Sequence, residues 1–193
     1  MLKEEIRILG FDEGPFENRT KGKVIVIGVV FRGGKVLDGL LRTDVTIDGL
    51  DATENLIKLI NSSRHKEQLK VVMLDGITLG GFNLVDIKKL SAQTNLPVIA
   101  ISRKIPNMNE IKKALKNFKD FETRWQIVKK AGKVKKCPLR EGKVLFYQNV
   151  GVTEEEAEEI IQLSCTRAFY PEPLRVAHII ATGIVKGESY GGA

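Results

Sequence analysis

The sequence contains no apolar run long enough to cross a bilayer, and residues 1–5 lack the apolar segment of a signal peptide. Both absences predict a cytoplasmic protein without a membrane partner. Only two cysteines are present, Cys137 and Cys165, and their spacing matches no metal-binding cluster, so we expect free thiols. There is no internal repeat and no low-complexity linker. Length and composition therefore predict one domain over residues 1–186, followed by a flexible tail at 187–193.

Basic residues are concentrated in one part of the chain. The formal net charge is +7, but residues 103–143 alone hold fourteen Lys or Arg against four Asp or Glu. A basic region of this kind is the usual footprint of a polyanion partner, so the pattern predicts binding of a nucleic acid, DNA or RNA. A solvated lysine-rich surface, as in heat-tolerant proteins, is the second interpretation of the same pattern.

The hydrophobic pattern predicts a block of strands followed by strands that alternate with helices. In chain order we expect strands at 5–12, 23–31 and 36–47, a helix at 53–60, a strand at 69–75, a helix at 83–93, a strand at 96–101, helices at 107–118 and 120–131, a short strand at 143–148, and helices that begin at Thr153 and after Pro173. The lysine-rich segment 129–136 is interpreted as a solvated loop or as the entry to a hairpin.

Short connections join the first three strands into an antiparallel meander, and the later alternation of strand and helix predicts parallel pairing. This order resembles a ribonuclease H-like fold. We therefore expect an α/β fold with a mixed five-stranded sheet and helices on both faces.

Two helices begin with the spacing of a capping box. Asp51 precedes Glu54 by three residues, and Thr153 precedes Glu156 by three residues. In both cases the first side chain is expected to accept a hydrogen bond from the backbone of the first helical turn.

Two predicted strands end in the same way, with an apolar run that leads into an aspartate. Residues 71–74 are Val-Val-Met-Leu and run directly into Asp75, and the strand at 5–12 ends at Asp12. An apolar run of this length is typical of a strand buried on both faces of a sheet, and ligands bind at the carboxyl ends of such strands. If the two strands are neighbours, Asp12 and Asp75 converge. Asp48 and Asp51 follow the third strand and could supply a third acid.

Clustered carboxylates repel each other, so they persist only with a raised pKa or with a bound cation. Mg²⁺ or Mn²⁺, held on Asp12, Asp75 and Asp48 or Asp51, would suit the hydrolysis of a phosphodiester. The structural alternatives are that Asp12 only ends a strand in a turn and that Asp51 only caps a helix.

Further candidates lie near these acids in the sequence. The glycines of the loop at 76–83 permit close approach of a ligand to the backbone, so we expect substrate contacts from Gly80, Gly81, Phe82 and Asn83. Arg103 and Lys104 follow the predicted strand at 96–101 and are expected to hold a nucleic-acid backbone.

Two residues of the last helix have competing interpretations. Arg175 either anchors a phosphate or forms an ion pair with Glu172 one turn earlier, and the ion pair is favoured. His178 has apolar neighbours, which favours a core histidine over a ligand.

Most of the chain resembles the archaeal endonuclease dU family, which is similar in turn to endonuclease V. The residues that carry the resemblance are Gly-Phe-Asp at 10–12, Leu-Asp-Gly at 74–76, Leu-Pro-Val-Ile-Ala-Ile-Ser-Arg-Lys at 96–104 and Tyr-Pro-Glu-Pro-Leu-Arg-Val-Ala-His at 170–178. The resemblance implies a ribonuclease H-like fold and a nuclease that uses Mg²⁺ or Mn²⁺ to cleave DNA with deaminated bases, such as uracil.

By motif position, the resemblance makes Asp12 and Asp75 metal ligands and puts Arg103 where endonuclease V keeps a lysine near the scissile phosphate. Where that family has a glutamate after the third strand, this chain offers Asp48 or Asp51. The loop after Asp75 also departs from endonuclease V, because residues 77–83 lack its His-Pro-Arg triplet.

Three functions remain open from the sequence. The first is a metal-dependent endonuclease for damaged DNA. The second is a nucleic-acid-binding protein without catalysis on the same fold, which the missing triplet and the aspartate in place of glutamate favour. The third is a phosphohydrolase for small nucleotides, for which the large basic region would be superfluous.

Overall fold

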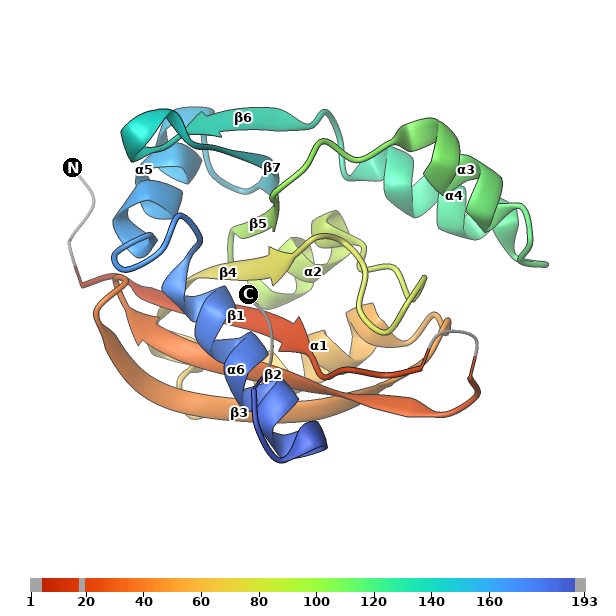
Figure 1. Cartoon of the computed structure of the whole chain (residues 1–193), viewed down its shortest axis with the longest axis horizontal. Helices are drawn as coiled ribbons and strands as arrows, with labels where there is room; N and C mark the ends of the chain where they lie inside the picture. The colour runs from red at the N-terminus through yellow and green to blue at the C-terminus, as the bar shows by residue number, and fades with distance from the viewer. Residues whose placement is uncertain (1–4, 18–19, 190–193) are drawn as a thin grey trace.

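A seven-stranded mixed sheet runs through the computed structural model, which describes residues 5–17 and 20–189 (Figure 1). The strand order is β3-β2-β1-β4-β5-β7-β6. The strands are β1 (Arg7–Glu13), β2 (Lys23–Arg32), β3 (Val36–Thr46), β4 (Leu69–Asp75), β5 (Val98–Ser102), β6 (Lys135–Pro138) and β7 (Val144–Val150). The meander of β1, β2 and β3 is antiparallel, and β4 pairs in parallel with both β1 and β5.

The expectation of five strands was wrong, because β7 and β6 extend the sheet beyond β5. Both pair antiparallel, β7 with β5 and β6 with β7, so parallel pairing does not continue to this edge. The lysines around β6 suggested a solvated loop or the entry to a hairpin, and the antiparallel pair of β6 and β7 confirms the second. In the structure only Cys137 of this strand is fully buried, while Lys136 and Pro138 are exposed, so the strand offers too little apolar sequence to be recognised.

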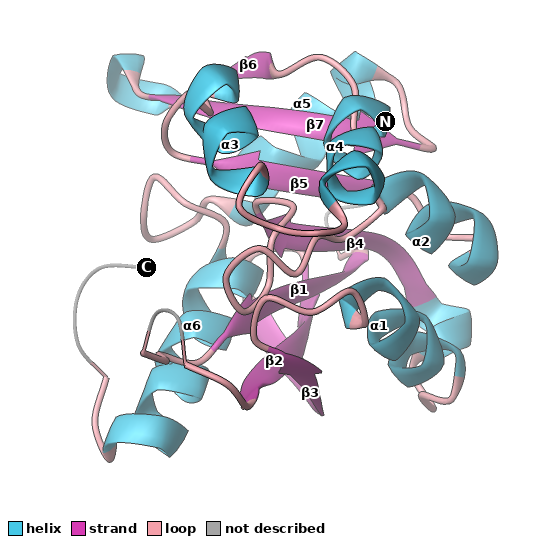
Figure 2. Cartoon of the chain, turned by 90° about the vertical axis from the view of Figure 1, so that its right-hand side faces the viewer, coloured by secondary structure: helices cyan, strands magenta, loops and turns pink. Residues whose placement is uncertain are grey.

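Helices cover both faces of the sheet, as predicted (Figure 2). The described residues form six α-helices, namely α1 (Ala52–Asn61), α2 (Ile87–Thr94), α3 (Met108–Leu115), α4 (Phe121–Lys130), α5 (Glu154–Ser164) and α6 (Glu172–Lys186). One face packs against α1 and α2, and the other against α5 and α6. The pair of α3 and α4 lies beyond the carboxyl ends of β1 and β4 (Figures 1 and 2).

The pairing of β1 with β4 follows from their apolar runs. All four residues of Val71–Leu74 are fully buried, as are Ile8, Leu9 and Phe11 of β1. A strand with both faces buried needs neighbours on both edges, and the central positions of the sheet provide them. In the parallel register Phe11 lies opposite Leu74, so the next residues, Asp12 and Asp75, lie side by side near the carboxyl ends of neighbouring strands.

The starts of two helices differ from the predictions. The helix expected at 83–93 begins only at Ile87, because Leu84 forms an isolated β-bridge with Thr78 and Asp86 caps the helix. The capping box predicted at Asp51 is absent, since its carboxylate makes no cap hydrogen bond. The capping box of Thr153 with Glu156 is confirmed.

Helix α6 packs very closely against β1. A Cβ atom placed on Gly10 would lie only 2.6 Å from both the carbonyl carbon and the Cβ of Pro173. Only glycine permits this approach, which seats the first turn of α6 directly on the strand that ends in Asp12.

The end of the chain is described only up to residue 189, and α6 ends at Lys186 with Gly187 as its left-handed cap. Residues 190–193 of the predicted flexible tail lie outside the described residues, so the tail stays a prediction. Among the helices of the described ranges, none combines the length and the apolar character needed to span a membrane.

We predict that Gly10→Ala lowers the free energy of unfolding by about 2–3 kcal/mol, because the new methyl group clashes with the backbone of Pro173. The matched control is Gly183→Ala within α6, where a Cβ meets nothing within 4 Å. That change should raise the free energy by up to about 1 kcal/mol, since alanine favours the helix. Urea unfolding followed by circular dichroism measures both. Equal stability of Gly10→Ala and the wild type would contradict the close seating of α6.

Candidate functional site

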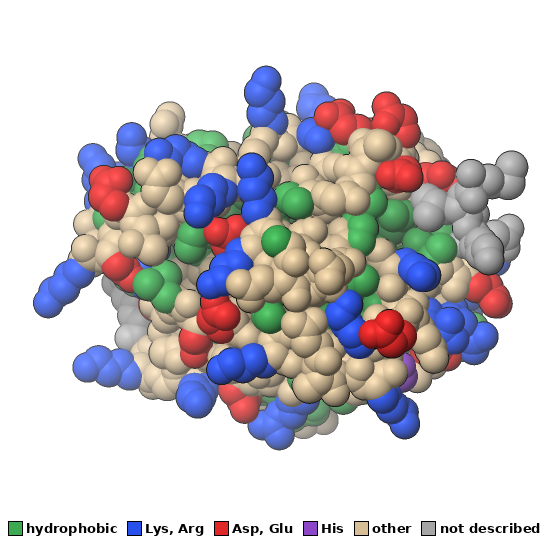
Figure 3. Space-filling view, turned by 180° about the vertical axis from the view of Figure 1, so that it is seen from behind, with side chains coloured by type: hydrophobic (Ala, Val, Ile, Leu, Met, Phe, Trp, Pro, Cys, Tyr) green, Lys and Arg blue, Asp and Glu red, His purple; other side chains and the backbone are tan. Residues whose placement is uncertain are grey.

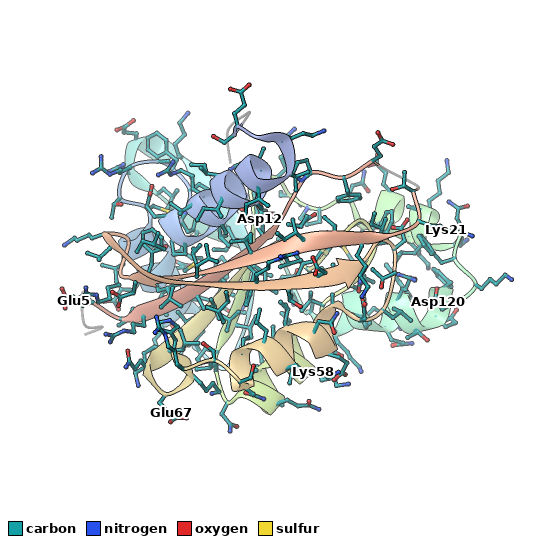
Figure 4. The ribbon with its side chains drawn as sticks, turned by 90° about the horizontal axis from the view of Figure 1, so that it is seen from below. Glu5, Asp12, Lys21, Lys58, Glu67 and Asp120 are labelled. Carbon is teal, nitrogen blue, oxygen red and sulfur yellow. The ribbon has the colours of Figure 1, made fainter. Side chains whose placement is uncertain are left out.

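The ends of β1 and β4 place two aspartates side by side. Asp12 is only 6 % exposed and lies where β1 meets α6, inside the outline of the molecule, whereas the labelled Lys21 and Lys58 lie at its periphery (Figure 4). Asp75 occupies the corresponding position on β4, and its charge acts on Asp12. The structure therefore brings together the two acids that the sequence predicted to converge.

Asp12 is held in place by two hydrogen-bond partners. One carboxylate oxygen, Oδ1, accepts the backbone N–H of Glu13 at 2.8 Å, and Oδ2 lies 2.9 Å from Nδ1 of His178 on α6. Burial raises the pKa of Asp12 to about 6, and the Asp75 carboxylate adds to the rise. His178 and the Glu13 N–H oppose it without cancelling it. Asp12 is thus a carboxylate that is costly to ionise without a nearby cation.

Asp75 has a different set of neighbours. Burial raises its pKa, and the Tyr170 hydroxyl, then Arg103, act to lower it. Tyr170 is 2 % exposed, and its hydroxyl interacts with the Asp75 carboxylate but forms no hydrogen bond of normal geometry in the described part of the chain. The Arg103 guanidinium lies over the Tyr170 ring, 4.1 Å from the ring centroid.

Glu13 brings a third carboxylate to the same strand end. Burial raises its pKa to about 8, with further contributions from Asp12 and then Asp75. The backbone N–H groups of Glu13 and Gly80 act in the opposite direction. Three carboxylates with raised pKa values therefore lie at this edge of the sheet. A cation bound here would stabilise their ionised forms.

The other two predicted acids lie in a separate hydrogen-bonded network. Asp48 Oδ1 accepts the backbone N–H of Phe82 at 2.8 Å. Asp51 accepts the hydroxyl of Thr46 at 2.8 Å and the side-chain amide of Asn83 at 2.6 Å. Burial acts to raise the pKa of Asp51, but the hydrogen bonds from Asn83 and Thr46 outweigh it and lower the pKa. The structure thus shows both acids satisfied by neighbouring loops.

Arg124 of α4 completes this network. Its side chain is buried, and its guanidinium donates to the carbonyl oxygens of Asp48 at 2.8 Å, Gly49 at 3.1 Å and Phe82 at 2.6 Å. It also pairs with Asp120, at 2.7 Å and 3.0 Å. One arginine therefore fixes α4 to the exit of β3 and to the glycine loop.

The glycine loop is more structural than predicted. Asn83 is fully buried and also accepts the backbone N–H of Ala52, so it is inaccessible to a substrate in this arrangement. Phe82 is half-buried, with its ring edge against Phe118 at 5.6 Å between centroids. Gly80 is buried and Gly81 is half-buried, both with positive φ. Of these four residues only Gly80 contacts the acidic cluster, through Glu13.

The predicted cationic residues divide into two groups. Arg103 and Lys104 are exposed at the end of β5, and Arg103 reaches the site through Tyr170. Arg175 instead forms a bidentate ion pair with the buried Glu172, at 3.0 Å and 2.7 Å, as the favoured interpretation predicted. On the back of the molecule, where α1 and α2 lie, basic and acidic side chains are interspersed (Figure 3).

Sequence reasoning missed three members of the site. His178 is not a core histidine, because its side chain is 29 % exposed and contacts Asp12. Tyr170 and His178 both fall within the motif at 170–178, but one sequence does not show that a helix would carry them to Asp12 and Asp75. Glu13 was visible as a second acid directly after Asp12. Its importance depends on burial, which the sequence does not reveal.

Asp12 and Asp75 are the side chains that could hold a divalent cation. Within the described residues, no group of three or more His, Cys, Asp or Glu side chains is arranged to hold a metal ion. Two carboxylates are nevertheless enough for Mg²⁺, which keeps several water ligands and takes substrate phosphate oxygens. The buried hydroxyl of Tyr170, beside Asp75, offers a partner for such a water.

The fold is shared with endonuclease V. An endonuclease V from Ciona intestinalis, solved in complex with DNA containing an inosine, superimposes with a TM-score of 0.61 over 95 % of this chain and 87 % of that one, at 16 % identity. A protein of unknown function from Archaeoglobus fulgidus superimposes with a TM-score of 0.84 over 94 % of this chain and 99 % of that one, at 40 % identity.

Sequence comparison gives the family directly. A Methanothermobacter thermautotrophicus protein described as a UPF0215 protein is 51 % identical over all of this chain and 94 % of its own length. The family model for endonuclease dU matches residues 4–185. This chain belongs to the endonuclease dU family.

We predict that Asp12→Asn stabilises the folded protein by about 1–3 kcal/mol at pH 7–8, because it removes a buried charge whose pKa is raised. The pKa of Asp12 is about 6 in the folded protein and 3.8 in the unfolded chain. The wild type therefore loses free energy of unfolding as the pH rises through the range between these two values, and this contribution is fully present below it. The difference between the two proteins should therefore vanish near pH 4. Urea unfolding across pH 4–8 in metal-free buffer measures it.

The matched control is Asp120→Asn, whose carboxylate pairs with Arg124 and has a lowered pKa for that reason. This variant should lose stability at pH 7, which is the opposite sign. A similar loss for Asp12→Asn would contradict the burial of an uncompensated charge at the end of β1.

Proposed function

We propose that this protein is a metal-dependent endonuclease that hydrolyses a phosphodiester in deaminated, uracil-containing DNA. The observation that carries the proposal is the pair of carboxylates, Asp12 and Asp75, at the ends of adjacent parallel strands. Their raised pKa values and the third acid at Glu13 create a site that is stabilised by a divalent cation.

The comparisons support the same class of reaction. The family is described as endonuclease dU, and the Ciona intestinalis neighbour was solved with DNA that contains a deaminated base, inosine. We interpret the sheet as ribonuclease H-like, since its antiparallel meander is followed by parallel strands with acids at their ends. This interpretation agrees with the chemistry that the two aspartates favour.

Each polar group of the site has a task in this proposal. Asp12 and Asp75 would hold Mg²⁺ or Mn²⁺, which activates water and stabilises the leaving oxygen of the phosphodiester. His178 fixes the orientation of the Asp12 carboxylate through its hydrogen bond at 2.9 Å. Arg103, exposed beside Asp75, is placed to bind a phosphate oxygen of the cleaved strand.

An apolar cavity lined by the chain segment that follows Asp75 is suited to a single base. It has a volume of ≈170 Å³ and begins at Gly76, directly after Asp75. Its walls are mostly apolar, and Thr78, Ser102, Tyr147 and Gln148 are the lining residues with polar side-chain groups. Enzymes that act at one base commonly turn it out of the helix into a pocket with few polar groups. We assign this cavity to the deaminated base.

The lysines of α3, α4 and β6 would hold the DNA backbone. Lys112, Lys113, Lys129, Lys130 and Lys136 are exposed, and α3 and α4 lie at the same end of the sheet as Asp12 and Asp75 (Figure 1). Contacts of this kind give affinity that falls steeply with salt. A phosphohydrolase for small nucleotides would need no such surface.

The alternative function is nucleic-acid binding without catalysis. It is favoured by the loop at 77–83, which lacks the His-Pro-Arg triplet of endonuclease V, and by the separate network that occupies Asp48 and Asp51. Salt-sensitive DNA binding without metal-dependent cleavage would select this alternative.

We predict that the wild type nicks a labelled duplex with one uracil when Mg²⁺ or Mn²⁺ is present, and that chelation of the metal abolishes nicking. Asp12→Asn and Asp75→Asn should each reduce the nicking rate by about 10²–10⁴-fold, because each removes a charge from the metal site. DNA affinity, measured by fluorescence anisotropy, should stay nearly unchanged. The matched control is Asp44→Asn on β3, whose carboxylate pairs only with Arg42 among the described ion pairs.

Undamaged and hypoxanthine-containing duplexes in the same assay test the target base. The parallel variants Glu13→Gln and Asp48→Asn test the third acid, and only Glu13→Gln should slow nicking strongly. Equal nicking by Asp12→Asn and the wild type would refute the proposed function.

A further inference from the structure

The two edges of the sheet are built very differently. β6, at one edge, is four residues long and contains Lys135, Lys136 and Pro138. Short length, lysine and proline are features that keep an edge strand from pairing with another chain. β3, at the other edge, is eleven residues long and contains neither lysine nor proline. One edge is therefore protected against the addition of a strand, and the other is not.

β3 also exposes apolar side chains. Val36, Leu37 and Leu40 are 41 %, 48 % and 51 % exposed. Leu37 and Leu40 lie opposite Phe31 and Val29 of β2, which belong to the apolar cluster under α6. Because paired residues point to the same face of a sheet, both leucines extend this apolar face to the open edge.

Hydrogen bonds at the carboxyl end of β3 show which backbone groups point away from the sheet. The carbonyl oxygen of Asp44 accepts the side-chain amide of Asn55 at 3.0 Å. The backbone N–H of Thr46 donates to the Asp51 carboxylate at 3.1 Å. Asp44 and Thr46 therefore direct their backbone groups outward, and their outward partners lie within the same chain.

The same alternation continues toward the start of β3. In an antiparallel ladder every second residue bonds to the neighbouring strand, and the residues between them point outward. The next outward residues after Asp44 are Arg42, Leu40 and Leu37, which lie opposite residues 27, 29 and 31 of β2. The register shift beside residue 31 keeps Leu37 in this series. None of these three has a hydrogen-bond partner for its outward backbone groups among the described residues.

The charge of β3 indicates which partner can cover it. The strand carries one arginine against two aspartates, whereas the whole chain has a net charge of +7. A nucleic acid gains no attraction from such a strand, and the lysine-bearing α3 and α4 lie away from it (Figures 1 and 2). A second copy of this chain can approach here without the repulsion between two basic surfaces.

β3 is complementary to itself when two copies pair antiparallel around Leu40. The two Leu40 residues then face each other, and Leu37 of each copy faces Arg42 of the other. These are the residues with outward backbone groups, so each pair exchanges hydrogen bonds between the chains. The four leucines form one apolar cluster with the aliphatic parts of the arginines. Pairing ends at Asp44, whose outward carbonyl is occupied by Asn55.

We propose that the protein is a homodimer in which the β3 strands of two copies pair antiparallel around Leu40, so that one sheet continues through both chains. The acidic site lies at the ends of β1 and β4, away from this edge, so each copy keeps an open site. The inference goes beyond the proposed function and does not depend on it.

Sedimentation of the full chain in high salt, which releases bound nucleic acid, measures the assembly. The wild type should sediment with the mass of two 21.5 kDa chains at concentrations up to about 100 μM. Leu40→Lys should weaken the dimer by about 100-fold, because it places two like charges opposite each other at the axis. Val144→Lys on β7 is the matched control, since Val144 is 41 % exposed, and this variant should remain dimeric. Thermal unfolding of the monomeric variant should still be cooperative.

A disulfide between the copies tests the register. Leu40→Cys should cross-link with oxidised glutathione, because the Cα atoms of a hydrogen-bonded pair lie about 5.5 Å apart. Asp44→Cys should not cross-link, since this register places the two copies of residue 44 far apart. The native thiols, Cys137 and Cys165, are buried and should not contribute. A monomeric wild type, a dimer that survives Leu40→Lys, or a dimer of Leu40→Cys that does not cross-link would overturn the proposal.

Discussion

The parallel pairing of β1 with β4 is the constraint on which the rest of the structure depends. It sets Phe11 opposite Leu74, so the two residues that follow, Asp12 and Asp75, meet at the same edge of the sheet. The buried carboxylate of Asp12 and the half-buried carboxylate of Asp75 repel each other here, which costs stability. Such a cost is typical of a site that has a function, because substitution by neutral residues would remove it.

Helix α6 and the residues just before it supply the other groups that surround the two aspartates. The absence of a side chain at Gly10 lets Pro173 approach the strand, and the helix then carries His178 to Asp12. Tyr170, just before the helix, reaches Asp75 and supports Arg103. The segment 170–178 thus interacts with both aspartates, although it is far from them in the sequence.

Arg124 fixes the position of α3 and α4 relative to the sheet. By binding three carbonyl oxygens of residues 48, 49 and 82, it fixes the basic pair of α3 and α4 to the exit of β3. The same network satisfies Asp48 and Asp51, so these acids support the loop that borders Glu13. The lysine-bearing helices and the acidic cluster are therefore parts of one connected framework.

The sequence predicts the elements whose pattern is local and strong. The apolar run at 71–74 predicted β4 and its acid, and the meander followed from three β-rich segments with short turns. It does not predict β6, whose single buried residue is Cys137, or the networks around Asp51 and Asn83, which form only when distant loops meet. His178 was missed for the same reason, since its contact with Asp12 spans 166 residues.

The most direct test of the account is the position of a bound cation. Crystals of the wild-type protein soaked with Mn²⁺ should show an anomalous difference peak between the carboxylates of Asp12 and Asp75, and Asp12→Asn crystals should show none there. A peak at Asp48 or Asp51 instead, or none near β1 and β4 at saturating Mn²⁺, would contradict the account.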